Sequence, residues 1–216
     1  MPIRILETYF IGVAFHIRVG GGMSNRVILV VGTPCVGKTS VARLLASKIN
    51  AFYINLTELA LNENLVSGVD KERGSVVVDE VRMQRKISEI IENIGKDVVV
   101  DGHYAASVAP EKFVTHVFVL RRDPVELRSF MEKAGFSGRK LWENLAAEIL
   151  DVCLFEVVKV YGLGKVCELN VTGKSVEDVV QEILDAVSGR IRCRVGVVDW
   201  LGKLESEGLL DEYLRI

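Results

Sequence analysis

The stretch GTPCVGKTS at residues 32–40 is the feature that most constrains this chain. It matches the pattern G-x-x-x-x-G-K-[S/T] and directly follows the apolar run at residues 27–31. A helix that begins inside such a loop offers unpaired N–H groups and partial positive charge to a phosphate, and the glycines let the backbone close around the anion. The pattern therefore predicts a strand, a phosphate-binding loop and a helix, in that order, with a nucleoside triphosphate as the ligand.

Individual residues of this loop have separate expected roles. We expect Lys38 to reach the β- and γ-phosphates, the Thr39 hydroxyl to bind Mg²⁺, and Ser40 to add a phosphate contact. Gly32 and Gly37 are the two glycines that shape the turn around the anion. The expected ligands of the loop are therefore ATP and Mg²⁺.

The spacing of the cysteines and the net charge argue against several classes of function. The four cysteines, Cys35, Cys153, Cys167 and Cys193, are far apart and form no C-x-x-C pattern. They indicate neither a zinc site nor a disulfide framework, which fits a reducing, cytoplasmic setting. Cys35 lies inside the phosphate loop, where we interpret it as a small residue at a tolerated position rather than as a redox centre. The net charge of −2 gives no general signal for nucleic-acid binding.

Short Val-rich runs alternate with amphipathic segments of helical length along the chain. Continuous apolar strands separated by helices are typical of a parallel sheet covered on both faces, so the expected fold class is a three-layer α/β P-loop fold. The predicted strands are 27–31, 52–54, 98–100, 114–120 and 166–169. The predicted helices are 38–49, 79–94, 124–134, 140–161 and 176–187.

Both ends of the chain fall outside this alternation, which leaves residues 23–189 as the predicted domain. Residues 1–22 are interpreted as an extension, with a short added strand or hairpin as the alternative. They carry Glu7 and lack a basic start, so we do not expect a signal peptide. Residues 190–216 predict one or two short amphipathic helices, which either pack on the domain or bind a partner.

The apolar run at 98–100 ends in a second candidate for the site, Asp101. Ligands of parallel sheets bind at the carboxyl ends of the strands, so Asp101 is placed to hold Mg²⁺ through water. The alternative is a strand-end Asp that caps the following turn. His103 lies in the same turn and either orients a water or phosphate or has a structural role.

Two long connections predict flaps over the phosphate loop. Residues 55–80 form a polar, Gly-containing connection, and residues 133–144 form a second one between two predicted helices. Connections of this length are often lids or substrate-binding segments. Two flaps suit phosphotransfer between two nucleotides, because the site must exclude water for the phosphoryl group to reach its acceptor.

Several stretches taken together resemble one family, the archaeal and eukaryotic adenylate kinase isoenzyme 6 group, also called coilin-interacting nuclear ATPases. The resemblance covers about residues 26–188, and its most specific parts are the Asp-x-His at 101–103 and the K-L-x-E-N-x-x-x-E-I run at 140–149. The stretches that carry it are GTPCVGKTS, YINLTELA, VVVDE, VVVDGHYAASVAPEKF, VFVLRRDP, AGFSGRKLWENLAAEILDV and VTGKSVED.

The resemblance implies a nucleoside monophosphate (NMP) kinase fold with a five-stranded parallel sheet. It implies an NMP-binding segment at 55–78 and a lid at 133–143. It also implies that Asp101 is the Walker B acid and His103 its companion. The ATP contacts that carry over are Cys35 through its backbone, Gly37, Lys38, Thr39, Ser40 and Lys174.

The chain departs from the family pattern at two positions. Cys35 stands where the family often has Gly, and Ala134 stands where the family's lid carries an Arg. An Arg there would stack on adenine or pair with phosphate. Arg128 or Arg139 could substitute for it, although the spacing does not require this.

The expected function that follows from the resemblance is an ATP:AMP phosphotransferase that also hydrolyses ATP. The family is implicated in small ribosomal subunit maturation through a ribosomal protein of the uS11 type, which is the partner that the resemblance implies. Two alternatives remain. One is an assembly factor that mainly hydrolyses ATP, and the other is a different small-molecule P-loop kinase, such as a cytidylate or shikimate kinase.

Overall fold

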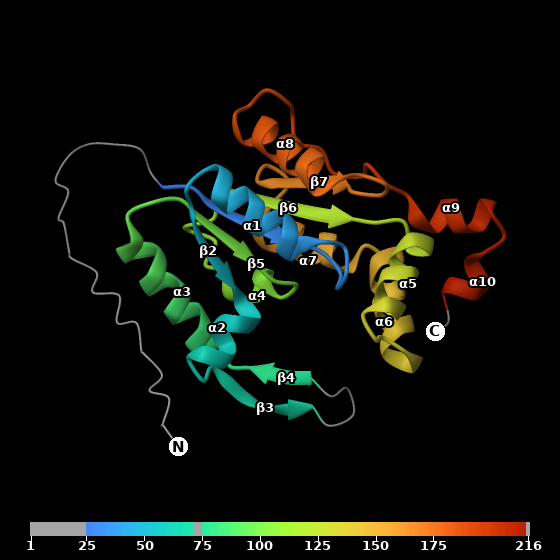
Figure 1. Ribbon diagram of the computed structural model, residues 1–216, viewed down its shortest axis with the longest axis horizontal. Coiled ribbons are helices and arrows are strands. Elements are labelled where there is room, and N and C mark those ends of the chain that lie inside the picture. Colours follow the sequence, from blue (N-terminus) through green and yellow to red (C-terminus); the bar gives the residue numbers. More distant parts are fainter. Residues whose placement is uncertain (1–24, 71–74, 215–216) are drawn as a thin grey trace, which may run out of the picture.

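A computed structural model describes residues 25–70 and 75–214, and a parallel five-stranded sheet organises them, with strand order β2-β5-β1-β6-β7 (Figure 1). The expected parallel five-stranded sheet is thus confirmed, whereas the extension at 1–22 lies outside the described residues. The strands are β1 (Val27–Val31), β2 (Phe52–Asn55), β5 (Val98–Asp101), β6 (His116–Arg121) and β7 (Val166–Asn170). All four neighbouring pairs in the sheet are parallel.

Helices cover both faces of this sheet, which confirms the three-layer α/β fold. On one face lie α1 (Lys38–Lys48) and α8 (Val176–Val187), which pack with Phe118 of β6 in one hydrophobic core. On the other face lie α3 (Glu80–Ile94), α4 (Ala105–Val108) and α7 (Val152–Tyr161), which share the second core. Strand residues alternate between the two cores, because successive side chains of a strand point to opposite faces.

The connection between β2 and α3 has its own secondary structure, which the sequence pattern did not predict. It consists of α2 (Leu56–Asn62) and an antiparallel hairpin of β3 (Val66–Asp70) and β4 (Ser75–Val78). Leu56 and Leu65 are buried in the core, whereas the hairpin extends away from the main sheet (Figure 1). The segment is therefore anchored at its base and projects over one side of the domain.

The prediction of one helix over 140–161 is wrong, because the chain forms two helices there. The first is α6 (Gly138–Ile149), and α7 follows it after a break at Asp151. Asp151 has a φ of 58°, and its carboxylate accepts a hydrogen bond from buried Arg121. A tertiary ion pair thus ends the helix within a sequence whose amphipathic pattern predicts one continuous helix.

The remaining helices lie beyond the carboxyl end of β6. Helix α5 (Pro124–Lys133) pairs with α6, and the C-terminal tail adds α9 (Trp200–Ser206) and α10 (Leu210–Tyr213) beside them (Figure 1). Trp200 and Leu204 are buried, so the tail packs on the domain, one of its two predicted arrangements. Within the described ranges, none of the helices has the length and apolar character needed to cross a membrane.

Candidate active site

The loop at 32–40 has the backbone shape that the sequence pattern predicted. Gly32 has a φ of 138° and Gly37 a φ of 106°, values that residues with a side chain rarely adopt. A Cβ at Gly32 would lie 2.5 Å from the carbonyl oxygen of Leu120, so glycine is also required there by space. Cys35 has a φ of 69°, which favours glycine and costs a side-chain-bearing residue about 1–3 kcal/mol.

Lys38 begins α1 and folds back over the loop. Its Nζ donates a hydrogen bond to the carbonyl oxygen of Thr33 at 2.9 Å, so the ammonium group lies across the turn. Burial lowers the pKa of Lys38, and the carboxylate of Asp101 partly offsets this effect. The first turn of α1 contains no acidic residue, which keeps this end of the helix attractive to an anion.

The two residues predicted to bind Mg²⁺ lie together. The Thr39 hydroxyl donates to Oδ2 of Asp101 at 2.7 Å, and Asp101 is 1% exposed. The same oxygen accepts hydrogen bonds from the Tyr53 hydroxyl at 3.0 Å and from Nδ2 of Asn55 at 2.9 Å. This hydroxyl–carboxylate pair at the start of α1 has the oxygen chemistry that Mg²⁺ requires.

Sequence reasoning missed Tyr53 and Asn55, although both belong to β2, which ends at Asn55. In the sheet, β2 is adjacent to β5, and Asn55 is directly opposite Asp101. The side chain of Asn55 makes two contacts: its Nδ2 donates to Asp101, and its Oδ1 caps α2 by accepting from the N–H of Glu58. The base of the 55–78 segment is thus tied to the predicted metal-binding carboxylate.

His103 lies in the turn after β5, as predicted, and its ring remains at the surface. Its ring packs edge-to-face on Tyr104, with centroids 4.9 Å apart. Desolvation and the positive charge of Lys38 lower the pKa of His103, while Asp101 opposes that effect. The imidazole is therefore mainly neutral near pH 7 and lies within electrostatic reach of both predicted catalytic residues.

The two other predicted ATP contacts lie at different places. Ser40 is exposed in the first turn of α1. Lys174 lies in the turn between β7 and α8, where its Nζ pairs with Glu182 at 2.6 Å. The adjacent Gly173 N–H donates to Glu126, which also pairs with Arg122. The structure therefore joins this turn to the phosphate loop through Arg122, and an ATP contact by Lys174 stays a prediction.

Arg122 is a site residue that sequence reasoning missed. Its Nη2 donates to the carbonyl oxygen of Val36 in the phosphate loop at 3.3 Å, and its guanidinium stacks on Phe130 at 4.9 Å. Within the described part of the chain, its Nε is buried without a hydrogen-bond partner. The available signal was its position directly after β6, at the edge of the sheet where ligands bind.

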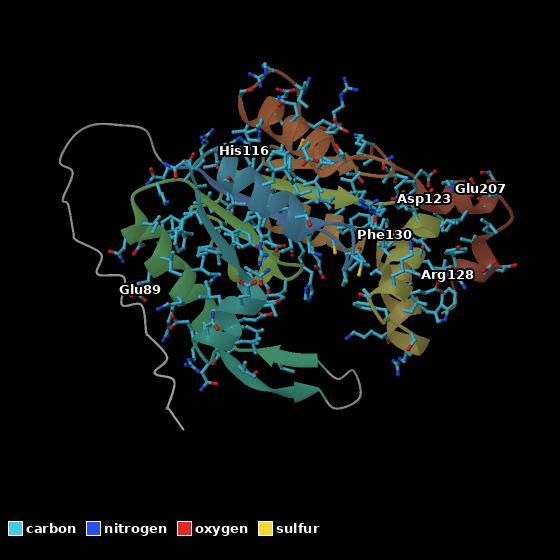
Figure 2. All side chains as sticks on the ribbon, viewed as in Figure 1. Glu89, His116, Asp123, Arg128, Phe130 and Glu207 are labelled. Carbon is cyan, nitrogen blue, oxygen red and sulfur yellow. The ribbon has the colours of Figure 1, made fainter. Side chains whose placement is uncertain are left out.

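The arginines considered as replacements for a lid Arg are held elsewhere. Arg128 pairs with Glu132 and with Glu212 of α10, and it lies over the rings of Trp142 and Tyr213 (Figure 2). Arg139 is exposed and pairs with Glu143 on its own helix. Ala134 is exposed at the end of α5. Both arginines are therefore engaged in ion pairs, and the replacement of a lid Arg by either of them stays a prediction.

A buried ion network lies beneath the phosphate loop. Arg121 pairs with Glu148, Glu168 and Asp151, and Glu148 also accepts from the Thr33 hydroxyl at 2.6 Å. The indole N–H of Trp200 donates to the same carboxylate at 3.1 Å. Because every oxygen of Glu148 is engaged, the network joins the phosphate loop, α6 and the C-terminal tail into one rigid base.

A cavity of about 430 Å³ lies between His103 and the connection that follows β2. Its walls come from α2, β4, the start of α3 and the turn after β5. The lining residues are Thr57, Ala60, Leu61, Val77, Val78, Glu80, His103 and Tyr104. The cavity is large enough for a small organic group and opens beside a residue of the candidate site.

Comparisons with known proteins identify relatives of this chain. A family model described as an AAA domain matches residues 28–151. A Methanocaldococcus jannaschii protein named "Putative adenylate kinase" is 36% identical over 82% of this chain and 93% of its own length. A Pyrococcus furiosus protein of the same name is 36% identical over 88% of this chain and 98% of its own length.

Solved structures support the fold. Shikimate kinase from Acinetobacter baumannii superposes with a TM-score of 0.56 at 16% identity, covering 78% of this chain and 96% of that one. A gluconokinase from Sinorhizobium meliloti gives a TM-score of 0.50 at 17% identity, over 77% of this chain and 94% of the other. The chain therefore belongs to the adenylate-kinase-like family of these archaeal relatives and is a P-loop phosphotransferase.

Proposed function

We propose that this protein transfers the γ-phosphoryl group of ATP to AMP, with a side reaction in which water is the acceptor. The proposal rests on one observation. Lys38, Thr39 and Asp101 lie together at the phosphate loop, and the cavity lined by His103 lies next to them on the side of the proposed NMP-binding segment. The names of the archaeal relatives support adenylate as the acceptor.

The donor side of the site suits a triphosphate. In the proposal, the N–H groups at the start of α1 and the Lys38 ammonium hold its phosphates. Thr39 and Asp101 would hold Mg²⁺, which would supply positive charge against the charge that develops on the phosphate oxygens. Arg122 adds a second positive charge at the outer side of the loop, next to Val36.

The acceptor side is the connection at 55–78 together with the turn after β5. His103 lies where the donor loop and the cavity meet. Its neutral ring can donate a hydrogen bond to a phosphate oxygen or accept one from water. We propose that it helps to orient the acceptor phosphate. The hairpin of β3 and β4 and the tip of the 133–143 lid would then restrict the entry of water.

The test is a coupled assay of ATP turnover with and without AMP. The proposal predicts that AMP accelerates ADP formation well above the rate with ATP and Mg²⁺ alone. A rate that AMP leaves unchanged, in a protein that still binds ATP, would instead favour the reading as an ATP-hydrolysing assembly factor.

The role in small-subunit maturation rests on the family resemblance alone, and we keep it as a second proposal together with a cytoplasmic location. It predicts that the protein binds a ribosomal protein of the uS11 type in one nucleotide state. Co-purification of the tagged full chain with ATP or ADP tests this, and recovery of no ribosomal protein in either state would remove the proposal.

A further inference from the structure

The C-terminal tail is connected to the phosphate loop through buried hydrogen bonds. Trp200, the first residue of α9, is 6% exposed, and its indole N–H donates to Oε1 of Glu148 at 3.1 Å. Oε2 of the same carboxylate accepts from the Thr33 hydroxyl at 2.6 Å. The main-chain carbonyl of Thr33 accepts in turn from Nζ of Lys38 at 2.9 Å. Three hydrogen bonds therefore connect the tail to the lysine of the phosphate loop.

Thr33 is the link between the two ends of this chain of contacts. The residue is 1% exposed, so water cannot readily replace the partners of its hydroxyl and carbonyl groups. The hydroxyl is held from below by Glu148, and the carbonyl holds the ammonium group of Lys38. Because unpaired buried polar groups are costly, the position of Glu148 determines where Thr33 and its carbonyl lie.

The tail also supplies donors to a second buried carboxylate. Oε2 of Glu168 accepts from the N–H groups of Gly196 at 2.6 Å and Val197 at 2.8 Å. Glu168 and Glu148 are both buried, and Arg121 forms an ion pair with each of them. Buried carboxylates require hydrogen bonds as well as a counter-charge. The neutral N–H groups of the tail meet part of this requirement, so the tail completes the network beneath the loop.

Other contacts attach the tail without involving Glu148. Lys203 of α9 forms an ion pair with Asp123 at 3.0 Å, just before α5 begins (Figure 2). Leu204 is buried in the core that contains α1 and α8. The tail therefore has anchors besides Trp200, and a mutation can separate its attachment from its contact with the network.

We propose that Trp200 positions Lys38 for the binding of ATP, so that the tail is a functional part of the donor site. The inference rests on the part of the proposed function that places ATP in the phosphate loop. Trp200 acts through Glu148 and Thr33, which makes it a positioning residue rather than a catalytic one.

The expected effect follows from the order of the contacts. Without the indole N–H, the Glu148 carboxylate loses the partner that holds it from the side of the tail, and it can turn away from Thr33. The Thr33 carbonyl then no longer fixes the Lys38 ammonium. A displaced ammonium binds phosphate more weakly, because a charge-assisted hydrogen bond depends on distance and alignment.

The test measures the dissociation constants of ATP with Mg²⁺ and of AMP by calorimetric titration of the full chain. Trp200→Phe keeps an aromatic ring at the buried position and lacks the N–H donor. It should raise the dissociation constant of ATP roughly fivefold or more, as expected for the loss of one buried hydrogen bond, and leave that of AMP nearly unchanged. A general loss of structure would weaken both ligands alike, and circular dichroism checks the fold.

Two further variants test the path from the tail to the lysine. Thr33→Val removes the hydroxyl on the side of the loop and leaves the tail unaltered, and it should weaken ATP by a similar factor. In a Lys38→Ala background, Trp200→Phe should change the affinity for ATP little, because the group that it positions is absent.

Lys203→Met is the matched control within the tail. It removes the ion pair with Asp123 and leaves the contact between Trp200 and Glu148 in place. The variant should lower the Tm slightly and leave the dissociation constant of ATP unchanged.

The outcomes separate this inference from the proposed function. An unchanged dissociation constant of ATP in Trp200→Phe or in Thr33→Val would overturn the inference. It would also be overturned by an equal loss in Lys203→Met, or by an effect of full size in the Lys38→Ala background. If AMP does not accelerate ADP formation, phosphotransfer to AMP fails, and the titrations with ATP still decide the role of Trp200.

Discussion

The Thr39 hydroxyl lies 2.7 Å from Oδ2 of Asp101, which links the start of α1 to the end of β5 across the sheet. The two residues are 62 positions apart in the chain. Their contact depends on β1 and β5 being adjacent parallel strands that end at the same edge. This edge is where the phosphate loop, His103 and the cavity meet, so the proposed chemistry depends on it.

Lys38→Ala should abolish phosphotransfer and hydrolysis and leave the fold intact. Its Nζ donates a hydrogen bond to the Thr33 carbonyl oxygen in the structure, whereas in the reaction it would offset charge on the phosphates. We expect turnover to fall roughly 100-fold or more. The assay is steady-state turnover, with circular dichroism to check the fold. Lys48→Ala, at the far end of the same helix, should keep full activity, and substantial turnover by Lys38→Ala would contradict the assignment.

Asp101→Asn should weaken Mg²⁺-dependent turnover more than metal-free nucleotide binding. The carboxylate accepts from three neutral donors, and an amide in its place lowers the attraction for the metal. The comparison is between turnover across a Mg²⁺ titration and nucleotide affinity in EDTA. Equal losses in the two measurements would mean that Asp101 has a purely structural role.

Glu148→Ala should destabilise the protein by about 3–5 kcal/mol, because it breaks a buried ion pair with Arg121 and leaves the buried donors of Thr33 and Trp200 without their acceptor. The measurement is the free energy of unfolding from urea denaturation. Glu143→Ala on the same helix removes a partner of exposed Arg139 and should cost less than about 1 kcal/mol. Similar losses in both variants would show that the network beneath the loop contributes little to stability.

Stability should fall as the pH is lowered through about 6.5, the ordinary pKa of histidine. Burial and the charge of Arg26 lower the pKa of His116 in the folded state, so the unfolded chain binds more protons in this range. Stability therefore rises with pH across the window and is highest above it. His116→Gln should flatten the slope of Tm between pH 5 and pH 7.5, as measured by thermal denaturation, and an unchanged slope would assign the dependence to other groups.

The sequence predicted those features of the fold and the site that neighbouring residues determine, and it missed those that depend on contacts between distant residues. Short patterns predict the loop at 32–40, the strand at 27–31 and the helix at 176–187. The structure has the strand and the helix with the predicted bounds. Asp101 could be placed because apolar strands end at one edge of a parallel sheet. Predicting these features requires only the neighbouring residues and the rule that the strands of a parallel sheet end at the same edge.

The parts that were missed depend on distant contacts. Nothing near Asp151 in the sequence indicates a helix break, because the cause is a pair with Arg121 from another strand. Tyr53 and Asn55 became site residues only because β2 lies beside β5, and strand order is not encoded in a local pattern. The position of Arg122 directly after β6 was the available signal, and its contact with Val36 of the phosphate loop is visible only in the fold.

Ala134→Arg should raise phosphotransfer relative to hydrolysis. Arg128 is held by Glu132 and Glu212, so an arginine at position 134 would add a charge that can pair with the nucleotide and help to exclude water. A contact of this type contributes about 1.5–3 kcal/mol when it forms fully, a factor of roughly 10 to 100 in rate. The measurement is the ratio of the two rates in wild type and variant. An unchanged ratio would assign the missing charge to Arg122, Arg139 or Lys140.

The fate of the γ-phosphate tests the central claim most directly. ATP labelled in that position is incubated with the full chain, Mg²⁺ and AMP, and the label is followed into ADP and into inorganic phosphate. The account predicts that most of the label enters ADP, that a visible fraction appears as phosphate, and that Lys38→Ala forms neither. Label that appears only as inorganic phosphate, at a rate that AMP does not change, would contradict it.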